Sequence, residues 1–271
     1  MTGDKSTHNG YAVSYSVATQ RLFRGQKTAV QKAEILSRLS RVFILSVVLC
    51  PLSTAIAASP SKVMASYGIY KGGIQIGQVE EVFARDKDRY TITSTTRAVG
   101  LLAIFKPGKI IYSSSGLIGA DGLRPLKFSD LREGEGGKDR SAEFDWSAKQ
   151  LTLIQKTQRN AVPLPDGTQD RLSAMYQFMF LALEKSDTLN FNMTNGGKLD
   201  SYQYHITPGQ DVTVSLGTFK ALYVASVPEA GAKRTEIWLA VEHANFPFKL
   251  VITDTDGGQL LQVLSKFDLV P

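Results

Sequence analysis

The segment from Asp170 to Glu184 constrains the fold most, because it joins helix-forming residues to an almost unbroken apolar surface. Between Ala174 and Leu183 only Gln177 is strongly polar. A helix that is apolar on nearly every side has no face suited to water, so other elements must cover it. We therefore predict a mainly β fold in which a curved antiparallel sheet, an open barrel-like roll, wraps around one long buried helix at about residues 170–185.

A polar residue marks the predicted start of this helix. Asp170 follows a stretch rich in proline and glycine, which favours a non-helical backbone. Its carboxylate can accept hydrogen bonds from the free N–H groups of a helix N-terminus, where a negative charge is also favoured. We predict that Asp170 is a structural cap. A catalytic role is the alternative, since Gln169 and Arg171 make Asp170 part of a polar cluster.

The helix also carries the candidate ligand-binding residues. In one interpretation its methionine and aromatic side chains simply fill the core, which the burial statistics of these residue types favour. In the other they line a lipid-sized cavity between helix and sheet, because such side chains suit apolar ligands. The candidate lining residues are Met175, Tyr176, Phe178 and Met179.

Short alternating runs through the rest of the chain predict about a dozen strands. Lys71-Gly72-Gly73 predicts a tight hairpin turn, and Gly77 predicts a bulge or bend in the strand that follows. Val99–Phe105 is apolar without a regular pattern, and Leu189–Lys198 has the composition of a polar loop. No stretch resembles a linker between domains, so we predict one β-rich domain over residues 58–271.

The N-terminal part has the order of features typical of an export signal. Arg38 and Arg41 precede the apolar run Val42–Leu49, and Ala55-Ile56-Ala57 follows as a small-x-small cleavage site. The apolar run is too short to span a membrane comfortably. We predict that residues 1–57 form an N-terminal extension and signal peptide, cut after Ala57, which delivers a periplasmic protein without a stable membrane span. A retained N-terminal anchor is the alternative.

Charge is concentrated in the same N-terminal part. The whole chain has a net charge of +6, but residues 1–57 hold seven Lys or Arg and two acidic residues, which leaves 24 basic and 23 acidic side chains in the rest. The near-neutral mature chain argues against binding to nucleic acid or, through net charge, to anionic membranes. The single cysteine, Cys50, precedes the cleavage site, so the mature chain has neither a disulfide nor a reactive thiol. Leu49 stands where a lipoprotein signal has a small residue, which argues against lipidation.

The sequence shows no motif for catalysis or for metal binding. His205 and His243 each lack a second ligand at metal-binding spacing, so we predict a structural or surface role for both. The run Gly134-Glu-Gly-Gly137 lacks the spacing of a phosphate-binding loop, and no Gly-x-Ser-x-Gly motif occurs. We therefore predict no catalytic residue, no metal site and no cofactor.

Short motifs spread over nearly the whole mature chain resemble those of one known family. In chain order they are Tyr70-Lys-Gly-Gly-Ile74, Ile76-Gly77, Gly116-Leu-Ile118, Gly122-Leu-Arg-Pro125, Phe144-Asp-Trp146, Pro165-Asp-Gly-Thr-Gln-Asp170, Leu172-Ser173, Tyr176-Gln177, Leu216-Gly-Thr-Phe219, Glu236-Ile-Trp238 and Phe246-Pro-Phe-Lys-Leu250. The chain thus resembles the bacterial "domain of unknown function 3108" family of exported proteins. The resemblance implies a curved, β-rich single domain and brings no catalytic residues with it.

These observations leave three functions open. The first is a periplasmic binding or carrier protein for an apolar or amphipathic envelope ligand, such as a lipid. The alternative is a non-catalytic structural or assembly factor that binds an envelope protein through a sheet edge or exposed aromatic side chains. A hydrolase acting on envelope polymers ranks last, because motifs for a nucleophile, a base and a metal are all missing.

Overall fold

The computed structural model describes residues 60–105, 107–134, 137–227 and 231–270. The predicted extension, signal peptide and cleavage site lie outside these residues. By its internal contacts the chain divides into Met1–Thr54 and Ala55–Pro271, and every described residue belongs to the second unit. The described residues form one sheet of fifteen strands with a few short helical turns, so the protein is mainly β, as the alternating pattern predicts.

The strands follow one another with short connections. The first eight are β1 (Lys62–Lys71), β2 (Ile74–Asp86), β3 (Arg89–Ala98), β4 (Lys109–Gly119), β5 (Gly122–Arg132), β6 (Arg140–Asp145), β7 (Gln150–Gln155) and β8 (Gln158–Pro163). The other seven are β9 (Gln169–Asp170), β10 (Thr188–Thr194), β11 (Leu199–Val214), β12 (Gly217–Ser226), β13 (Arg234–Ala240), β14 (Phe246–Thr253) and β15 (Gln259–Val270).

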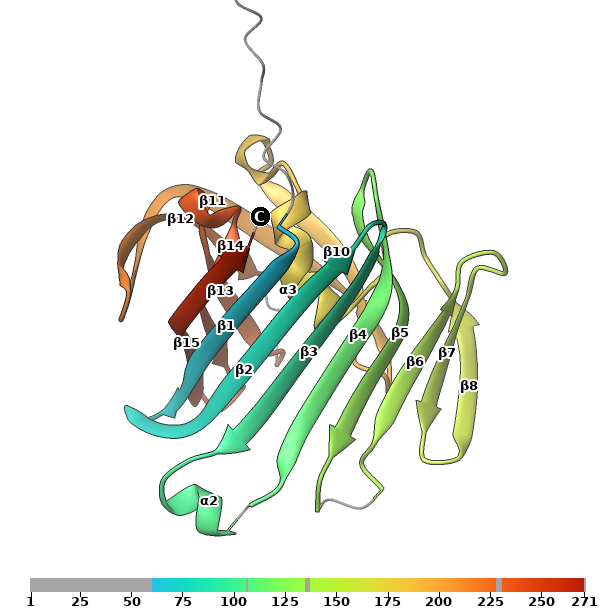
Figure 1. The fold of residues 1–271 in the computed structure, drawn as a ribbon, viewed down its shortest axis with the longest axis horizontal. Coiled ribbons are helices and arrows are strands. Elements are labelled where there is room, and N and C mark those ends of the chain that lie inside the picture. The colour runs from blue at the N-terminus through green and yellow to red at the C-terminus, as the bar shows by residue number, and fades with distance from the viewer. Residues whose placement is uncertain (1–59, 106, 135–136, 228–230, 271) are drawn as a thin grey trace, which may run out of the picture. The chain divides into compact units, whose positions relative to one another are not determined.

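The strand order places the first and the last strand side by side in the middle of the sheet. From β1 the chain proceeds strand by strand to β8 at one edge, crosses to β9 at the other edge, and returns strand by strand to β15, which pairs with β1. Neighbouring strands are antiparallel except β9 and β10, which are parallel. The two edges do not pair, so the curved sheet in Figure 1 remains open.

The prediction of one long buried helix is wrong. α3 (Ser173–Gln177) has five residues and continues for a single 3₁₀ turn, η1 (Phe178–Phe180), after which Leu181 is extended. A further 3₁₀ turn, η2 (Leu183–Lys185), leads toward β10. The chain has to turn after η1 because its apolar side chains belong to two separate parts of the core.

The core consists of two groups of buried side chains, and the α3–η1 segment contributes to both. Tyr176 belongs to the larger group, which includes buried side chains of β1 to β3, β5 to β7 and β11 to β15. Phe178 and Leu183 belong to the smaller group, against β10 to β13. Met175 packs against both groups. We name β1 to β8 and β9 to β15 the two arms of the open sheet. The α3–η1 segment fills the space between these arms.

Other short elements also differ from the sequence interpretation. The predicted turn at Lys71-Gly72-Gly73 is confirmed, and the register shift between β1 and β2 falls beside Gly77. In contrast, β8 was not predicted, and β10 replaces the polar loop expected at Leu189–Lys198. Both are polar strands near the sheet edges, where a buried apolar row is not needed. α2 (Leu101–Phe105) is a short helix where an irregular segment was expected.

Candidate functional site

The chain crosses from one sheet edge to the other through residues 164–187, here named the crossover segment. Gln169 Nε2 donates a hydrogen bond of 2.8 Å to the carbonyl oxygen of Leu123 on β5. Two residues later, the Arg171 N–H donates to the carbonyl oxygen of Thr194 on β10, at 3.0 Å. The crossover segment therefore connects the two arms of the sheet across its opening.

Asp170 is the centre of a buried hydrogen-bond network within this segment. Its Oδ2 accepts a hydrogen bond of 2.6 Å from Ser114 Oγ, and Ser114 Oγ lies 3.2 Å from the hydroxyl of Tyr90. Its Oδ1 accepts from the N–H groups of Leu172 and Ser173 at 2.9 and 2.8 Å. Asp170 lies two residues before the N-cap position, Leu172, so its carboxylate holds the turn that leads into α3.

Complete burial changes the acidity of this carboxyl group. Asp170 has no exposed surface, and removal from water disfavours a charged carboxylate. Burial raises the pKa of Asp170 from its ordinary value to about 6, although the hydrogen bonds from Ser114, Ser173 and Leu172 act in the opposite direction. Inside the protein, Asp170 therefore loses its proton at a higher pH than an exposed aspartate does.

Glu81 on β2 forms a second polar network with α3. Its Oε2 accepts a hydrogen bond of 3.2 Å from the hydroxyl of Tyr176, and its Oε1 accepts one of 2.9 Å from Ser94 Oγ. Burial raises the pKa of Glu81, while the hydrogen bonds from Ser94 and Tyr176 lower it. The hydrogen bond to Glu81 fixes the position of the Tyr176 hydroxyl, while the ring packs against Phe83 and Phe246.

Gln177 and Gly122 together bring α3 into close contact with β5. Gln177 Oε1 accepts from the N–H of Leu123 at 2.6 Å, and Gln177 Nε2 donates to the carbonyl oxygen of Asp121 at 2.7 Å. Gly122 has a φ of +91°, and a Cβ at this position would lie 2.5 Å from Gln177 Oε1. A glycine is required here for both its backbone angle and the close approach of the glutamine.

The four predicted cavity-lining residues lie in packed surroundings. Tyr176 stacks on Phe83 with ring centroids 5.4 Å apart and meets Phe246 edge-on at 5.5 Å. Phe178 meets Phe191 edge-on at 5.7 Å. Tyr176 and Phe178 have no exposed surface, whereas Met175 and Met179 are partly buried. None of the four residues lines the groove along β15 or the hollow over β3 to β6.

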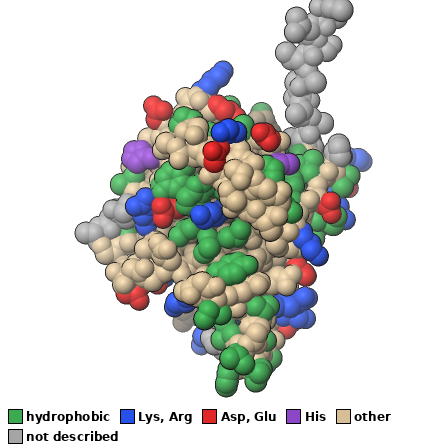
Figure 2. Space-filling model, turned by 90° about the vertical axis from the view of Figure 1, so that its left-hand side faces the viewer, with side chains coloured by type: hydrophobic (Ala, Val, Ile, Leu, Met, Phe, Trp, Pro, Cys, Tyr) green, Lys and Arg blue, Asp and Glu red, His purple; other side chains and the backbone are tan. Residues whose placement is uncertain are grey.

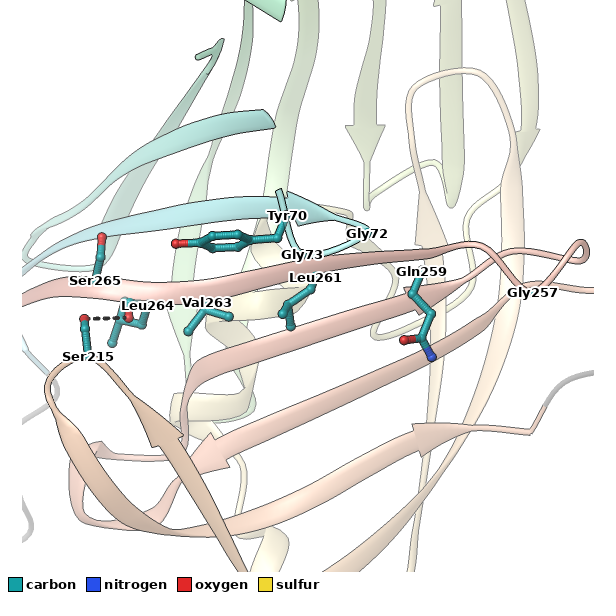
Figure 3. A pocket seen from close by; sticks show the side chains of 10 residues that line it. All are labelled: Tyr70, Gly72, Gly73, Ser215, Gly257, Gln259, Leu261, Val263, Leu264 and Ser265. Atoms are coloured by element: carbon teal, nitrogen blue, oxygen red, sulfur yellow. Dashed lines mark hydrogen bonds between the residues drawn. The ribbon is translucent and has the colours of Figure 1, made fainter. Parts of the chain in front are cut away.

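The larger hollow is a groove of about 680 Å³ along β15. Figure 3 shows Gln259, Leu261 and Val263 one after another along this strand, with Tyr70 on the neighbouring β1. Ser215, from the β11–β12 turn, borders the groove and donates a hydrogen bond of 3.5 Å to the carbonyl oxygen of Leu264. The volume is in the range of small-molecule sites in proteins.

The floor of the groove is apolar although it lies on the outer side of the sheet. Leu261 is opposite Tyr70 in the strand register, and Val263 is opposite Gly68. A Cβ on Gly68 would lie 2.7 Å from Tyr70 Cε2, so the tyrosine ring lies flat over this glycine. Together the ring and the two aliphatic side chains form a continuous apolar strip between polar, uncharged neighbours. Those neighbours are Ser215, Gln259 and Ser265.

Sequence reasoning missed the groove because its residues come from distant strands. Tyr70 and Val263 are almost 200 positions apart, and only the β1–β15 pairing brings them together. A usable signal was nevertheless present. In the run Gln259-Leu-Leu-Gln-Val-Leu264, large apolar residues occupy both faces of a strand, although one face was expected to meet water.

The second hollow, of about 440 Å³, lies over β3 to β6 and is mainly lined by hydroxyl side chains. His205 is exposed, whereas His243 packs against the rings of Phe219, Phe248 and Phe267. In the described part of the chain, no three His, Cys, Asp or Glu side chains gather as a metal site would require. No helix among the described residues has the length and hydropathy needed to cross a membrane.

Comparison with known proteins identifies relatives of the fold. A family model described as "Protein of unknown function (DUF3108)" matches residues 64–263. Among solved structures, a beta-barrel-like protein of the domain of unknown function DUF1849 from Brucella abortus is similar, with a TM-score of 0.51 and 13% sequence identity. The alignment covers 77% of this chain and 98% of that one, and at this identity it shows the fold alone. No curated protein matches the chain.

Proposed function

The chain belongs to the DUF3108 family of proteins of unknown function, and within it we propose that this protein is an exported binding or carrier protein for an amphipathic ligand. The groove along β15 is the observation that carries the proposal. Its strip of Tyr70, Leu261 and Val263 suits an alkyl chain or a flat apolar ring, because contact with this strip removes apolar surface from water. Ser215, Ser265 and Gln259 can form hydrogen bonds with a polar group of the same molecule.

The lining of the groove restricts the class of ligand. It contains no Lys, Arg, Asp, Glu or His, so it offers no charge for a highly charged small molecule. It is also open on one side, which leaves part of a bound molecule in contact with water. A lipid or another envelope molecule with an uncharged apolar part fits both properties.

Export is the second part of the proposal. The order Arg38, Arg41, Val42–Leu49 and Ala55-Ile56-Ala57 supports a cleaved signal peptide and a periplasmic location. Mass spectrometry of the protein recovered from the periplasm should find a mature N-terminus at Ala58. An N-terminus before Arg41, or recovery only with the membrane, would contradict cleavage.

Ligand binding can be tested with a substitution that fills the groove. Ser265 is exposed and lines the groove, so Ser265→Trp should occupy it without disturbing the core. The matched control is Lys266→Trp, because Lys266 is the next residue, is also exposed, and does not line the groove. Titration with a fluorescent fatty-acid analogue should show about tenfold weaker binding for Ser265→Trp and unchanged binding for Lys266→Trp.

Two results would contradict the proposal. One is the absence both of probe binding and of any copurified lipid in native mass spectrometry and solvent extraction. The other is equal affinity for wild type and Ser265→Trp. If a ligand copurifies and remains bound to Ser265→Trp, the groove is not its site, and the interior beside Met175 and Met179 becomes the place to examine.

A specific observation also favours the alternative, an assembly factor that binds an envelope protein. Among the described strands β8 pairs with β7 alone and so forms a sheet edge, and all its residues except Val162 are exposed. An edge of this kind can accept a strand from another protein. A photo-crosslinking amino acid at Asn160 should then capture one defined envelope protein in cells, whereas the same amino acid at Lys266 should not.

A further inference from the structure

Among the short helices of the described residues, α2 exposes the most large apolar side chains. It lies between β3 and β4, and none of its five residues is buried. Leu101, Ile104 and Phe105 are 77%, 72% and 79% exposed, and Leu102 is 36% exposed. Single exposed apolar residues are common on protein surfaces, but four large ones on one helical turn form a continuous apolar surface. We name these four side chains, Leu101, Leu102, Ile104 and Phe105, the apolar tip.

The tip stands at one end of the sheet. Figure 1 shows α2 at the lower end, beyond the ends of β3 and β4. Figure 2, turned about the vertical axis, shows hydrophobic side chains gathered at the same lower end. Ile74, the first residue of β2, is 70% exposed and adds to the apolar surface at this end.

Positive charge accompanies the apolar tip. From Arg97 to Lys109 the sequence has three cations, Arg97, Lys106 and Lys109, and no acidic residue. Arg97 forms an ion pair with Glu80, with 3.6 Å between Nη1 and Oε2, and both side chains are about half exposed. The positive charge in excess of this pair comes from Lys106 and Lys109, and it is local, because residues 58–271 as a whole are nearly neutral. A short segment that combines exposed apolar side chains with flanking cations is complementary to the surface of an anionic lipid bilayer.

The size of the tip distinguishes between a membrane and another protein as its partner. A stable protein–protein interface buries roughly 800 Å² on each partner, with about 20 or more residues on each side. A helix of five residues is too small to provide such an interface. A bilayer requires no matching surface, since a few apolar side chains can enter the headgroup region individually while cations remain near the lipid phosphates.

We propose that α2 is a membrane-docking tip, which inserts Leu101, Ile104 and Phe105 into the interfacial region of an anionic phospholipid bilayer. The contact is weak and reversible, because a few side chains supply much less than a membrane-spanning helix. The groove along β15 begins at Gly72, Gly73 and Gly257, in turns at the same end of β1 and β15. The docked protein would therefore present the groove to the membrane, a consequence that rests on the proposed ligand binding, whereas the docking itself does not.

Flotation with lipid vesicles tests the docking. The purified protein should float with vesicles of phosphatidylethanolamine and phosphatidylglycerol, and less with vesicles of phosphatidylcholine or in high salt. The double variant Ile104→Ser/Phe105→Ser should lower the bound fraction about tenfold. The control is Val241→Ser, which removes an apolar side chain that is 38% exposed in η3 (Val241–His243), away from the tip. It should bind as wild type does.

A second measurement uses Phe105→Trp, a variant in which the tip remains apolar. Phe105→Trp should add a tryptophan emission that shifts to shorter wavelength when anionic vesicles are added, as compared with the wild type, which has Trp146 and Trp238. Equal flotation of wild type and the double serine variant would overturn the proposal. So would a wild type that binds no vesicles but self-associates through the tip in analytical ultracentrifugation. Probe binding in solution, compared between wild type and Ser265→Trp, reports on the groove separately.

Discussion

The two short α-helices among the described residues are equal in length and opposite in environment. α2 has the sequence LLAIF and no buried residue, whereas α3 has the sequence SAMYQ and buries four of its five residues. Apolar content alone would have predicted the reverse, because α2 is the more apolar of the two. The difference lies in the polar side chains, since α3 has Ser173 and Gln177 where α2 has none.

These polar side chains give α3 a fixed place. Gln177 forms two hydrogen bonds to the backbone at β5, and Asp170 holds the turn before the helix through Ser114, Leu172 and Ser173. Hydrophobic contact is not directional, so it can hold a segment against a sheet without defining its position. Hydrogen bonds define the position. The difference teaches that α3 has a defined position in the core, while α2 lies at the surface with no buried residue.

The largest expected effect compares one aromatic residue from each helix. Tyr176→Ala should lower the free energy of unfolding by about 3–5 kcal/mol, because it removes a buried ring that contacts Phe83 and Phe246. Phe105→Ala should change it by less than about 0.5 kcal/mol, because the ring is exposed. Urea denaturation followed by circular dichroism measures both. Similar losses for the two variants would mean that α2 packs against the fold in solution.

The second prediction removes the polar centre of the crossover segment. Asp170→Ala should lower the free energy of unfolding by about 3 kcal/mol at pH 5, because it leaves buried donors from Ser114, Leu172 and Ser173 without their acceptor. Asp170→Asn should cost less, since an amide oxygen can still accept the two backbone hydrogen bonds. If alanine and asparagine were equally destabilising, the backbone hydrogen bonds would not be the reason.

The third prediction concerns pH. The pKa of Asp170 is raised by burial to about 6 in the folded protein, so between pH 4 and pH 6 the folded state binds more protons at this residue than the unfolded state does. The stability that Asp170 contributes is therefore present at low pH and decreases by about 2 kcal/mol as the pH rises from 4 to 6. Denaturation curves across this range should show the decrease in wild type. Asp170→Asn should lack the part of the decrease that the ionisation of Asp170 causes. An identical pH dependence of stability in both proteins would refute the assignment.

The smallest expected effect concerns the tip itself. Ile104→Ser/Phe105→Ser should leave the free energy of unfolding within about 0.5 kcal/mol of the wild-type value, because neither side chain is buried. Thermal unfolding in the absence of lipid tests this. A loss above that limit would show that the tip stabilises the fold, and the vesicle experiments would then need a different variant.

The sequence predicts the strands of this protein better than its central segment. Most strands can be predicted from the alternation of apolar and polar residues, because one face of the sheet is buried and the other is not. Glycine turns such as Lys71-Gly72-Gly73 mark where the strands end. The prediction of a long helix failed because periodicity cannot reveal that neighbouring apolar residues belong to two core groups. The end of the motif Pro165–Asp170 has a role that the pattern did not predict, because Thr168, Gln169 and Asp170 are buried and their hydrogen bonds hold the crossover segment in place.

The candidate site could be predicted less well. The groove depends on the pairing of β1 with β15, which local sequence patterns do not contain. The apolar run Leu101–Phe105 was visible, but whether it lies inside or outside the fold depends on strand order and not on composition. The carboxyl pKa of Asp170 depends on burial and on Ser114, which is 56 positions away in the sequence.

The neighbouring positions of β1 and β15 also determine when the fold can be completed. Ser61 and Val270 are joined by hydrogen bonds across a separation of 209 residues, so β1 obtains its second neighbour only when β15 has been synthesised. Closing so long a loop is slow. The middle of the sheet therefore stays incomplete until β15 has been synthesised, although β1 to β8 can already pair with one another before then.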